Sequence, residues 1–231
     1  MNKLSIRKLI KDIVNHPVIV EPASYLFWRR PTGIDQETWN REYAKGYWDY
    51  LGGLNEMSRF AVIAGYCRTI ASATSLLDIG CGNGNLSAWV CQDKDLRYVG
   101  IDIAGVAIQQ ACERGESQAR FEVADAATFD PGGRFDVIVF NEMLFYLPKP
   151  ELVLARYESF LAPDGVFIIS MWRATESLRT WRRCTSRLEV LDHVRLRATS
   201  TIEWDIRLCR PGKDLAQRPN LNSAASNGRA P

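Results

Sequence analysis

Short apolar runs alternate with longer amphipathic stretches along the chain from residue 75 onward. Runs of this kind are typical of buried strands, and the stretches between them are long enough to form helices. The alternation therefore predicts an α/β fold in which helices cover the faces of a parallel sheet. The expected strands are Ser75–Ile79, Arg97–Asp102, Ala119–Val123, Phe135–Asn141 and Gly165–Met171.

Helices are expected after most of these strands, and a hairpin is expected near the C-terminus. Two β-rich stretches there are separated by a short polar turn, which predicts an antiparallel pair added to the otherwise parallel sheet. The expected helices are Asn85–Gln92, Gly105–Arg114, Pro150–Leu161 and Thr175–Arg187, and the hairpin strands are His193–Ala198 and Thr201–Leu208.

Composition divides the chain into three parts. Residues 1–74 form an accessory segment, in which Ser5 can cap a short helix and prolines then interrupt regular structure. A further helix is expected over Glu56–Thr69. The tail, 211–231, contains almost nothing large and apolar, so we expect it to be mobile. Aromatic residues of the accessory segment either pack between helices or cover a site in the domain 75–210, and they are Trp39, Tyr43, Tyr47, Trp48 and Tyr50.

The composition and charge are those of an ordinary globular protein. With 29 Lys and Arg against 27 Asp and Glu, the net charge is only +2, so nothing favours nucleic acid as a partner. A charged N-terminus and the absence of a run of about 20 apolar residues argue against a signal peptide and a membrane span. Six cysteines without a C-x-x-C pair or a cysteine–histidine cluster predict reduced thiols, a cytoplasmic location and no metal.

One stretch carries candidate chemistry. The first strand ends in Asp78 and leads into alternate glycines, from Gly80 to Gly84, before a helix. Alternate glycines permit positive φ angles and close approach of a ligand to the backbone, and a helix start offers unpaired N–H groups. Asp102 closes the next strand at about the separation at which doubly wound folds place the acid that binds a ribose diol, and Asp125 follows the third strand.

A nicotinamide-dependent oxidoreductase is the less favoured interpretation of this loop. The dinucleotide fingerprint G-x-G-x-x-G requires a glycine where Asn85 stands. Asp78 also places a carboxylate where a pyrophosphate would want none. A carboxylate beside the loop suits a cationic ligand instead.

The pattern D-x-G-x-G-x-G from Asp78 to Gly84, with acids ending the next two strands, resembles the class I S-adenosylmethionine-dependent methyltransferases. The strand Phe135–Asn141 and the turn and strand Leu161–Ile169 extend the resemblance, which covers about residues 75–210. It implies a Rossmann-like, doubly wound sheet of seven strands in the order 3-2-1-4-5-7-6, with strand 7 antiparallel and helices on both faces. It also implies S-adenosylmethionine as the cofactor.

The resemblance further implies roles for individual residues at the cofactor. Asp102 would hydrogen-bond the ribose hydroxyls, and Ile103 would pack on the adenine. Asp125 would accept a hydrogen bond from the adenine amino group, with the backbone of Ala126 beside it. Asn141 would lie near the methionine part and the transferring methyl group. The loop residues that would face the methionine part are Gly80, Cys81 and Gly82.

Two residues have an ordinary alternative beside the cofactor role. Related enzymes often place an arginine of the preceding helix against the cofactor carboxylate, and Arg59 is the residue in that position here. Its alternative is a solvated arginine on a helix face. Asp78 either contacts the cofactor or only orients the glycine loop.

The candidate catalytic residues are Glu142, Tyr146 and His193. Glu142 leaves the cofactor edge of the sheet and could take a proton, or it is a cofactor contact. Tyr146 could line the acceptor pocket, or it belongs to the core. His193 has the pKa of a base near neutral pH, although a histidine at the start of a strand is often structural.

The resemblance makes methyl transfer the expected activity, and the acceptor is expected to be a small molecule. Amino-group methylases of DNA and RNA show Asn or Asp followed by Pro-Pro and an aromatic residue after the fourth strand, whereas Glu142 follows Asn141 here. We expect O- or N-methylation of a sugar or specialised metabolite by a monomer or homodimer. The alternative is a catalytically silent module that binds S-adenosylmethionine and acts as a partner or regulator.

Overall fold

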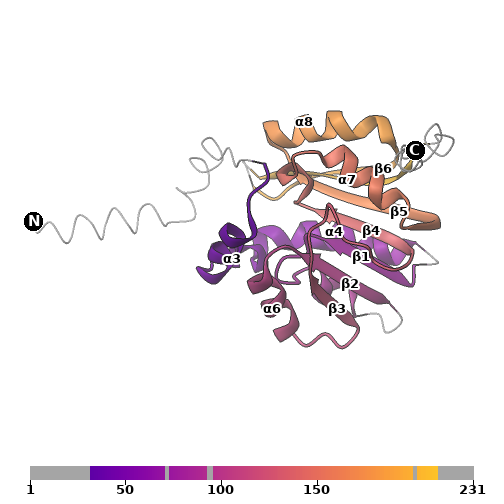
Figure 1. Cartoon of the computed structure of the whole chain (residues 1–231). Helices are drawn as coiled ribbons and strands as arrows, with labels where there is room; N and C mark the ends of the chain where they lie inside the picture. Colours follow the sequence, from indigo (N-terminus) through magenta and orange to yellow (C-terminus); the bar gives the residue numbers. More distant parts are fainter. Residues whose placement is uncertain (1–31, 71–72, 93–95, 200–201, 213–231) are drawn as a thin grey trace, which may run out of the picture.

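Seven strands form a single mixed sheet in the computed structural model, which describes residues 32–70, 73–92, 96–199 and 202–212 (Figure 1). The strand order is β3-β2-β1-β4-β5-β7-β6, and β7 runs antiparallel to both of its neighbours. This order confirms the predicted Rossmann-like sheet. The strands are β1 (Ser75–Ile79), β2 (Arg97–Asp102), β3 (Ala119–Val123), β4 (Phe135–Asn141), β5 (Leu161–Trp172), β6 (Leu188–Arg197) and β7 (Glu203–Pro211).

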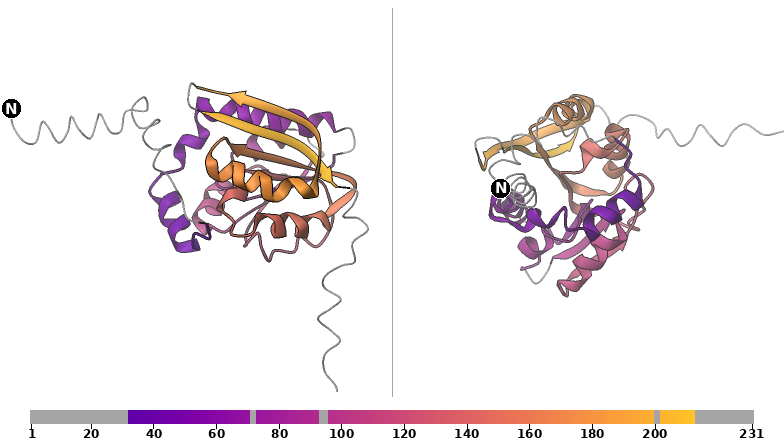
Figure 2. Two further views of the ribbon diagram at one scale, coloured as in Figure 1. Left: turned by 90° about the horizontal axis from the view of Figure 1, so that it is seen from above. Right: turned by 90° about the vertical axis from the view of Figure 1, so that its left-hand side faces the viewer.

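Side chains alternate between the two faces along the central strands, and each face packs against its own helices (Figure 2). On β5, Phe167 and Ile169 lie in one core cluster with α7 (Pro150–Glu158) and α8 (Thr175–Cys184). Val166 and Ile168 lie in the other cluster, with α4 (Leu54–Thr69) and α5 (Ser87–Val90). None of the helices within the described ranges is long and apolar enough to cross a membrane.

The first four strands begin and end where the sequence predicts, whereas the C-terminal elements differ. β5 begins at Leu161 rather than Gly165, because Leu161 already pairs with Phe135. An irregularity with extra residues in β5 then follows before Val166 pairs with Val137. The hairpin strands are longer on the side away from their turn, since Leu188 still pairs with Pro211. α8 ends at Cys184, and the 3-10 turn η3 (Thr185–Arg187) completes the expected helix. The helix expected after Ser5 and the tail from residue 213 lie outside the described residues.

Part of the accessory segment lies against the carboxyl end of β2. The helix α3 (Gln36–Ala44) packs beside α6 (Gly105–Glu113), as Figure 1 shows. The Gln36 side chain donates a hydrogen bond to the Ile103 carbonyl (2.8 Å), and the Val106 N–H donates to Asn40 Oδ1 (3.0 Å). These two hydrogen bonds fix α3 at the beginning of α6. The 3-10 turn η1 (Asp49–Gly52) then leads into α4.

Candidate active site

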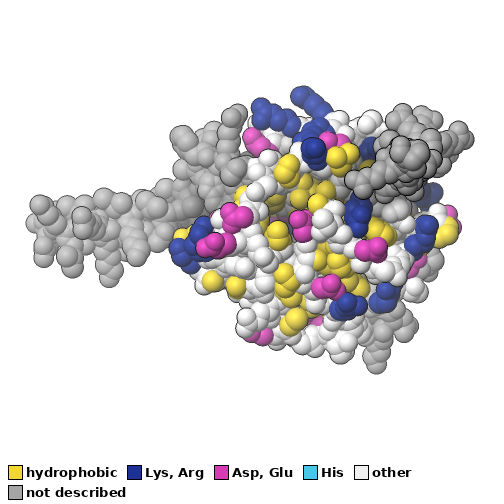
Figure 3. Space-filling model, viewed as in Figure 1, with side chains coloured by type: hydrophobic (Ala, Val, Ile, Leu, Met, Phe, Trp, Pro, Cys, Tyr) yellow, Lys and Arg dark blue, Asp and Glu magenta, His cyan; other side chains and the backbone are white. Residues whose placement is uncertain are grey.

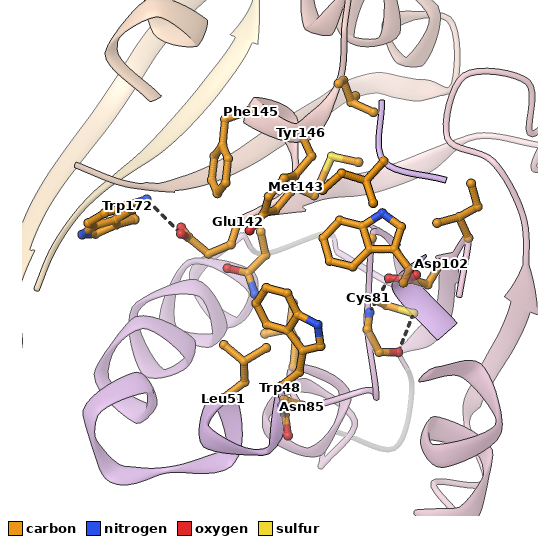
Figure 4. A pocket seen from close by; sticks show the side chains of 18 of the residues that line it. Trp48, Leu51, Cys81, Asn85, Asp102, Glu142, Met143, Phe145, Tyr146 and Trp172 are labelled. Carbon is orange, nitrogen blue, oxygen red and sulfur yellow. Dashed lines mark hydrogen bonds between the residues drawn. The ribbon is translucent and has the colours of Figure 1, made fainter. Parts of the chain in front are cut away.

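A cavity of about 1610 Å³ lies at the carboxyl ends of the central strands (Figure 4). Open α/β sheets bind their ligands at this edge. The wall comes from the glycine loop, the ends of β2, β4 and β5, the start of β7 and the segment from α3 to α4. Single-ligand pockets typically measure about 300–1,000 Å³. The cavity therefore has room for two ligands.

The glycine loop after β1 is held close to its neighbours. Gly80 and Gly82 have φ angles of +72° and +55°, which side chains rarely adopt. A Cβ atom added to Gly82 would lie 2.7 Å from the Tyr43 hydroxyl oxygen, and one added to Gly80 would lie 2.9 Å from Met143 Cβ. The N–H groups of Gly80 and Cys81 both donate to the Ile101 carbonyl. The loop thus forms a narrow cradle of backbone that only glycine permits.

Asp102 ends β2 beside this loop, and its carboxylate is fixed by backbone. Its Oδ2 accepts from the Gly82 N–H (2.9 Å), and its Oδ1 accepts from the Ala104 N–H (2.8 Å). Burial raises the pKa of Asp102, and these N–H groups act to lower it. Each carboxylate oxygen can accept a further hydrogen bond. The cradle and this carboxylate therefore fit a cofactor that carries a ribose.

Glu142 follows β4 in an unusual backbone conformation. Its φ of +59° makes it the only non-glycine residue with positive φ among the described residues. The Ser170 hydroxyl donates to Oε1 (3.1 Å). The Trp172 N–H donates to Oε2 (2.9 Å), as drawn in Figure 4. Burial raises the pKa of Glu142 to about 6, although the guanidinium of Arg59 opposes the shift. A half-buried carboxylate is thus held on the cavity wall.

Arg59 forms part of the same wall and is 1% exposed. Its Nη2 donates to Glu56 Oε2 (2.6 Å), and its Nη1 donates to Asn141 Oδ1. The guanidinium also lies 5.5 Å from the centre of the Trp204 ring. The helix α4 and the end of β4 are therefore tied together through one buried cation. The Nε atom of Arg59 is buried and has no partner among the described residues.

Aromatic side chains of the accessory segment meet those of η2 (Leu144–Tyr146) across the cavity. The Trp39 ring lies edge-on to Tyr146, with 5.0 Å between their centres, and 5.5 Å from Trp48. The Trp48 indole N–H donates to a Glu42 carboxylate oxygen (3.2 Å). Tyr43 and Trp48 are buried in a small core cluster with the start of α6. These contacts place aromatic residues of the accessory segment over the cavity.

Most of the residues singled out from the sequence line this cavity, and two do not. Asp78 lies behind the loop, and its Oδ2 accepts from the Tyr98 hydroxyl (2.6 Å). His193 lies on the edge strand β6, where its Nε2 is 3.0 Å from Asp205 Oδ1. The structure therefore does not bring His193 to the site. The residues that line the cavity are Arg59, Gly80, Cys81, Gly82, Asp102, Ile103, Asp125, Ala126, Asn141, Glu142 and Tyr146.

Several residues of the cavity wall were not among those expected from the sequence. Glu56 precedes Arg59 by three positions, a spacing that places both on one helix face, so this pair carried a usable signal. Trp172 ends β5 at the edge of the sheet where ligands bind, so its position also indicated a residue of the site. Trp204 lies beside Trp172 because the two residues pair in the β5–β7 register, which the sequence alone does not reveal. Ser170, behind the wall, reaches Glu142 with its hydroxyl because β5 pairs with β4 at Asn141.

Comparison with known proteins places the chain among methyltransferases. The family model described as a methyltransferase domain matches residues 43–207, more than half of the chain. Trans-aconitate 2-methyltransferase of Methylobacterium radiotolerans is 35% identical over 96 residues, which are 41% of this chain and 36% of that protein. Ubiquinone biosynthesis O-methyltransferase of Pasteurella multocida is 28% identical over 169 residues, 64% of this chain and 68% of that protein. Matches to the first relatives span between 36% and 51% of their lengths.

Solved structures share the fold. N-methyltransferase NodS from Bradyrhizobium japonicum, in complex with S-adenosyl-L-homocysteine, has a TM-score of 0.66 at 20% identity, over 77% of this chain and 98% of that one. The 1,6-didemethyltoxoflavin-N1-methyltransferase of Burkholderia thailandensis has a TM-score of 0.60 at 18% identity, over 80% and 94% of the two chains. With the family match, the glycine cradle and the fixed carboxylate of Asp102, the chain belongs to the class I methyltransferases that use S-adenosylmethionine as cofactor.

Proposed function

We propose that this protein transfers a methyl group from S-adenosylmethionine to a hydroxyl or amine of a small molecule. The observation that carries the proposal is the continuity of the cavity. One end has the glycine cradle and Asp102, the other has Glu142 among aromatic side chains, and the volume accommodates two ligands. The names of relatives such as trans-aconitate 2-methyltransferase describe small acceptors for those proteins, which supports the same class of reaction here.

In this proposal, the glycine cradle and the residues around it hold the cofactor along its whole length. Asp102 accepts from the ribose hydroxyls, Ile103 packs on the adenine, and Asp125 with the backbone of Ala126 accepts from the adenine amino group. Arg59 pairs with the cofactor carboxylate through N–H groups not used by Glu56 or Asn141. Asp78 supports β1 and β2 through Tyr98 without touching the ligand. The cradle residues at the methionine part are Gly80, Cys81, Gly82 and Asn141.

The remaining residues align the acceptor and exclude water. S-adenosylmethionine supplies a methyl group that is already activated on a sulfonium, so alignment and desolvation are the main contributions required of the protein. Glu142 takes the proton that the acceptor loses, and its orientation is fixed by Ser170 and Trp172. Tyr146 lines the acceptor pocket. The aromatic residues of the accessory segment close the cavity, and their ring faces suit a cationic sulfonium.

Two measurements test the proposal. Calorimetry measures the binding of S-adenosylhomocysteine, and a turnover assay measures the formation of S-adenosylhomocysteine from S-adenosylmethionine. Asp102→Asn removes charge-assisted hydrogen bonds, each worth about 1.5–3 kcal/mol, so affinity is expected to fall about 10-fold or more. Asp164→Asn is the control, because Asp164 is exposed and lies outside the cavity. Wild-type affinity in Asp102→Asn would contradict the assignment. Binding without transfer to any acceptor would favour the silent binding module.

A further inference from the structure

The acceptor end of the cavity has a distinct chemistry. In Figure 4, the Glu142 carboxylate lies next to Trp172, with Phe145 above and Leu51 below. Cys81 and Asp102 lie on the opposite side, where the cofactor is proposed to bind. We use the name acceptor end for the group of lining residues Leu51, Glu142, Phe145, Trp172 and Trp204. Its members come from η1, the segment after β4, β5 and β7, which are distant in sequence.

Three of the five residues of the acceptor end are aromatic. Trp172 and Trp204 are direct neighbours in the β5–β7 register, and Phe145 lies 4.4 Å from the centre of Tyr146. Trp204 is also covered by the Arg59 guanidinium, so its position is fixed by packing. Aromatic side chains on a cavity wall favour a planar ligand, because stacked and edge-on contacts contribute about 0.5–1.5 kcal/mol beyond burial.

The charges on the cavity wall are unfavourable for an anionic acceptor. Carboxylate ligands are usually held by arginine or lysine, and the wall offers few such groups. Arg59 is already paired with Glu56, which leaves Lys149 as the remaining base among the described lining residues. The described charged residues of the wall are the acids Glu56, Asp102, Asp125, Glu142 and Glu176 and the bases Arg59 and Lys149.

We propose that the acceptor is a neutral amine carried on a flat, largely apolar ring system, and that it bears no carboxylate. This inference rests on the proposed function and narrows it to N-methylation of an aryl amine. The aromatic surfaces take the ring, and the Glu142 carboxylate lies where the amino group would meet the cofactor end. A tricarboxylate such as trans-aconitate does not suit this wall.

The chemistry of the step agrees with an amine. The lone pair of the nitrogen forms the new N–C bond, the methyl–sulfur bond breaks with its electron pair left on sulfur, and the N–H proton passes to Glu142. The cationic product of an aryl amine is about as acidic as a carboxylic acid, so it readily gives up this proton. A phenol, with a pKa of about 10, is a poor proton donor to a carboxylate whose pKa is about 6.

Matched acceptors test the inference on the full chain. We would measure binding of 5-aminoindole, 5-hydroxyindole and trans-aconitate by isothermal titration calorimetry with S-adenosylhomocysteine present, and methylation by mass spectrometry with S-adenosylmethionine. Expected is a kcat/KM for the amine at least about 10-fold above that for the phenol, with no methylation of trans-aconitate. Phe145→Leu should raise the KM for the amine, whereas Phe160→Leu, outside the cavity, should leave it unchanged.

The outcomes separate this inference from the function on which it rests. Methylation of 5-hydroxyindole or trans-aconitate at a rate equal to or above that of the amine overturns the inference and leaves methyl transfer standing. Failure of 5-aminoindole to bind the complex with S-adenosylhomocysteine also overturns it. Failure of S-adenosylhomocysteine itself to bind overturns the proposed function. An unchanged KM for the amine in Phe145→Leu also overturns the inference, because the aromatic wall would then contribute nothing to binding.

Discussion

Glu142 combines a left-handed backbone with a carboxylate held by two hydrogen bonds. Strain of this kind costs on the order of 1–3 kcal/mol and persists where the surrounding structure enforces it. Here β4 pairs with β5 up to this point, and the Glu142 N–H itself donates to the Ser170 carbonyl. The backbone and the side chain are thus fixed by the same segment of β5, which is what a proton acceptor of defined direction requires.

The first prediction concerns the pH profile of this residue. A base is active when deprotonated, and burial raises the pKa of Glu142 from an ordinary carboxyl value to about 6. We therefore expect kcat to rise with pH through about 6 and to level off above it. Glu142→Gln should abolish this rise and lower kcat by about 10²–10⁴-fold, with affinity for S-adenosylhomocysteine nearly unchanged. Equal losses in kcat and in affinity would make Glu142 a cofactor contact instead.

The second prediction concerns Asp78, whose pKa is raised to about 7 by burial even though Tyr98 donates a hydrogen bond to it. The folded protein keeps this proton up to about pH 7, whereas an unfolded chain loses it near pH 4. The stability that the protonated carboxyl contributes is therefore lost as pH rises to about 7. Between pH 5 and 8, Asp78→Asn should gain about 2–3 kcal/mol in unfolding free energy relative to wild type.

Asp136 provides the control for this experiment. Burial acts to raise its pKa, but hydrogen bonds from Thr74 and Ser75 outweigh burial and lower it. The stability that Asp136 contributes is present above the ordinary carboxyl pKa and is lost only in more acidic solution. The effect of Asp136→Asn on urea denaturation should thus stay constant from pH 5 to 8. A constant difference for Asp78→Asn as well would show that Asp78 is ionised throughout.

Among the elements, α3 is the part of the accessory segment most directly tied to the cofactor end. It is attached to the start of α6 by the side chains of Gln36 and Asn40, and its Tyr43 hydroxyl lies against Gly82. We expect such a helix to separate from α6 more readily than the sheet unfolds, because its hydrogen bonds to the β2–α6 region come from the side chains of Gln36 and Asn40. We infer that α3 acts as the cover under which the cofactor is held.

The third prediction tests this cover. Asn40→Ala removes the acceptor of the Val106 N–H, which caps the beginning of α6, and such a loss costs about 1 kcal/mol. Dissociation of S-adenosylhomocysteine should become about fivefold faster, and hydrogen exchange in residues 36–44 should lose its protection by the ligand. Gln109→Ala is the control, since within the described part of the chain the Gln109 side chain bonds only to Glu113 of its own helix. Unchanged dissociation in Asn40→Ala would separate α3 from cofactor binding.

Elements buried on both faces were predictable from the sequence, and elements at the edge were less so. The sequences of β1 and β4 are short apolar runs that end at turn residues, so both the apolar run and its end are visible in the sequence. β6 is the edge strand, and most of its side chains face solvent. Only its C-terminal part therefore showed a β-rich pattern, and its beginning at Leu188 depends on pairing with β7.

For the whole molecule, the sequence singled out more of the cavity-lining residues around the glycine loop than of those at the acceptor end. Asp102 and Glu142 follow strands whose carboxyl ends meet at one edge, so their proximity follows from the parallel sheet. The acceptor end includes Trp172 and Trp204, which become neighbours through the pairing of β5 with the antiparallel β7. His193 shows the reverse case. Its residue type suggested a base, but its position on β6 takes it away from the cavity.

The small net charge also hides an uneven distribution of charge. Figure 3 shows Lys and Arg side chains gathered over α8 and hydrophobic side chains in the middle of the same face. The cavity wall, in contrast, has more acids than bases among the described residues. The net charge of the whole chain therefore gives no information about the charge of the acceptor. The local balance at the site is the quantity that bears on its chemistry.

The positive φ of Glu142 has a consequence for engineering this protein. Glycine adopts that conformation without steric cost, whereas every other side chain pays for it. A stabilisation campaign that scored only resistance to heat would thus prefer glycine to alanine at this position, the reverse of the order in a helix. The carboxylate proposed to take the proton stands where folding alone would favour a residue with no side chain. Thermostable variants should therefore be selected with turnover measured alongside melting temperature.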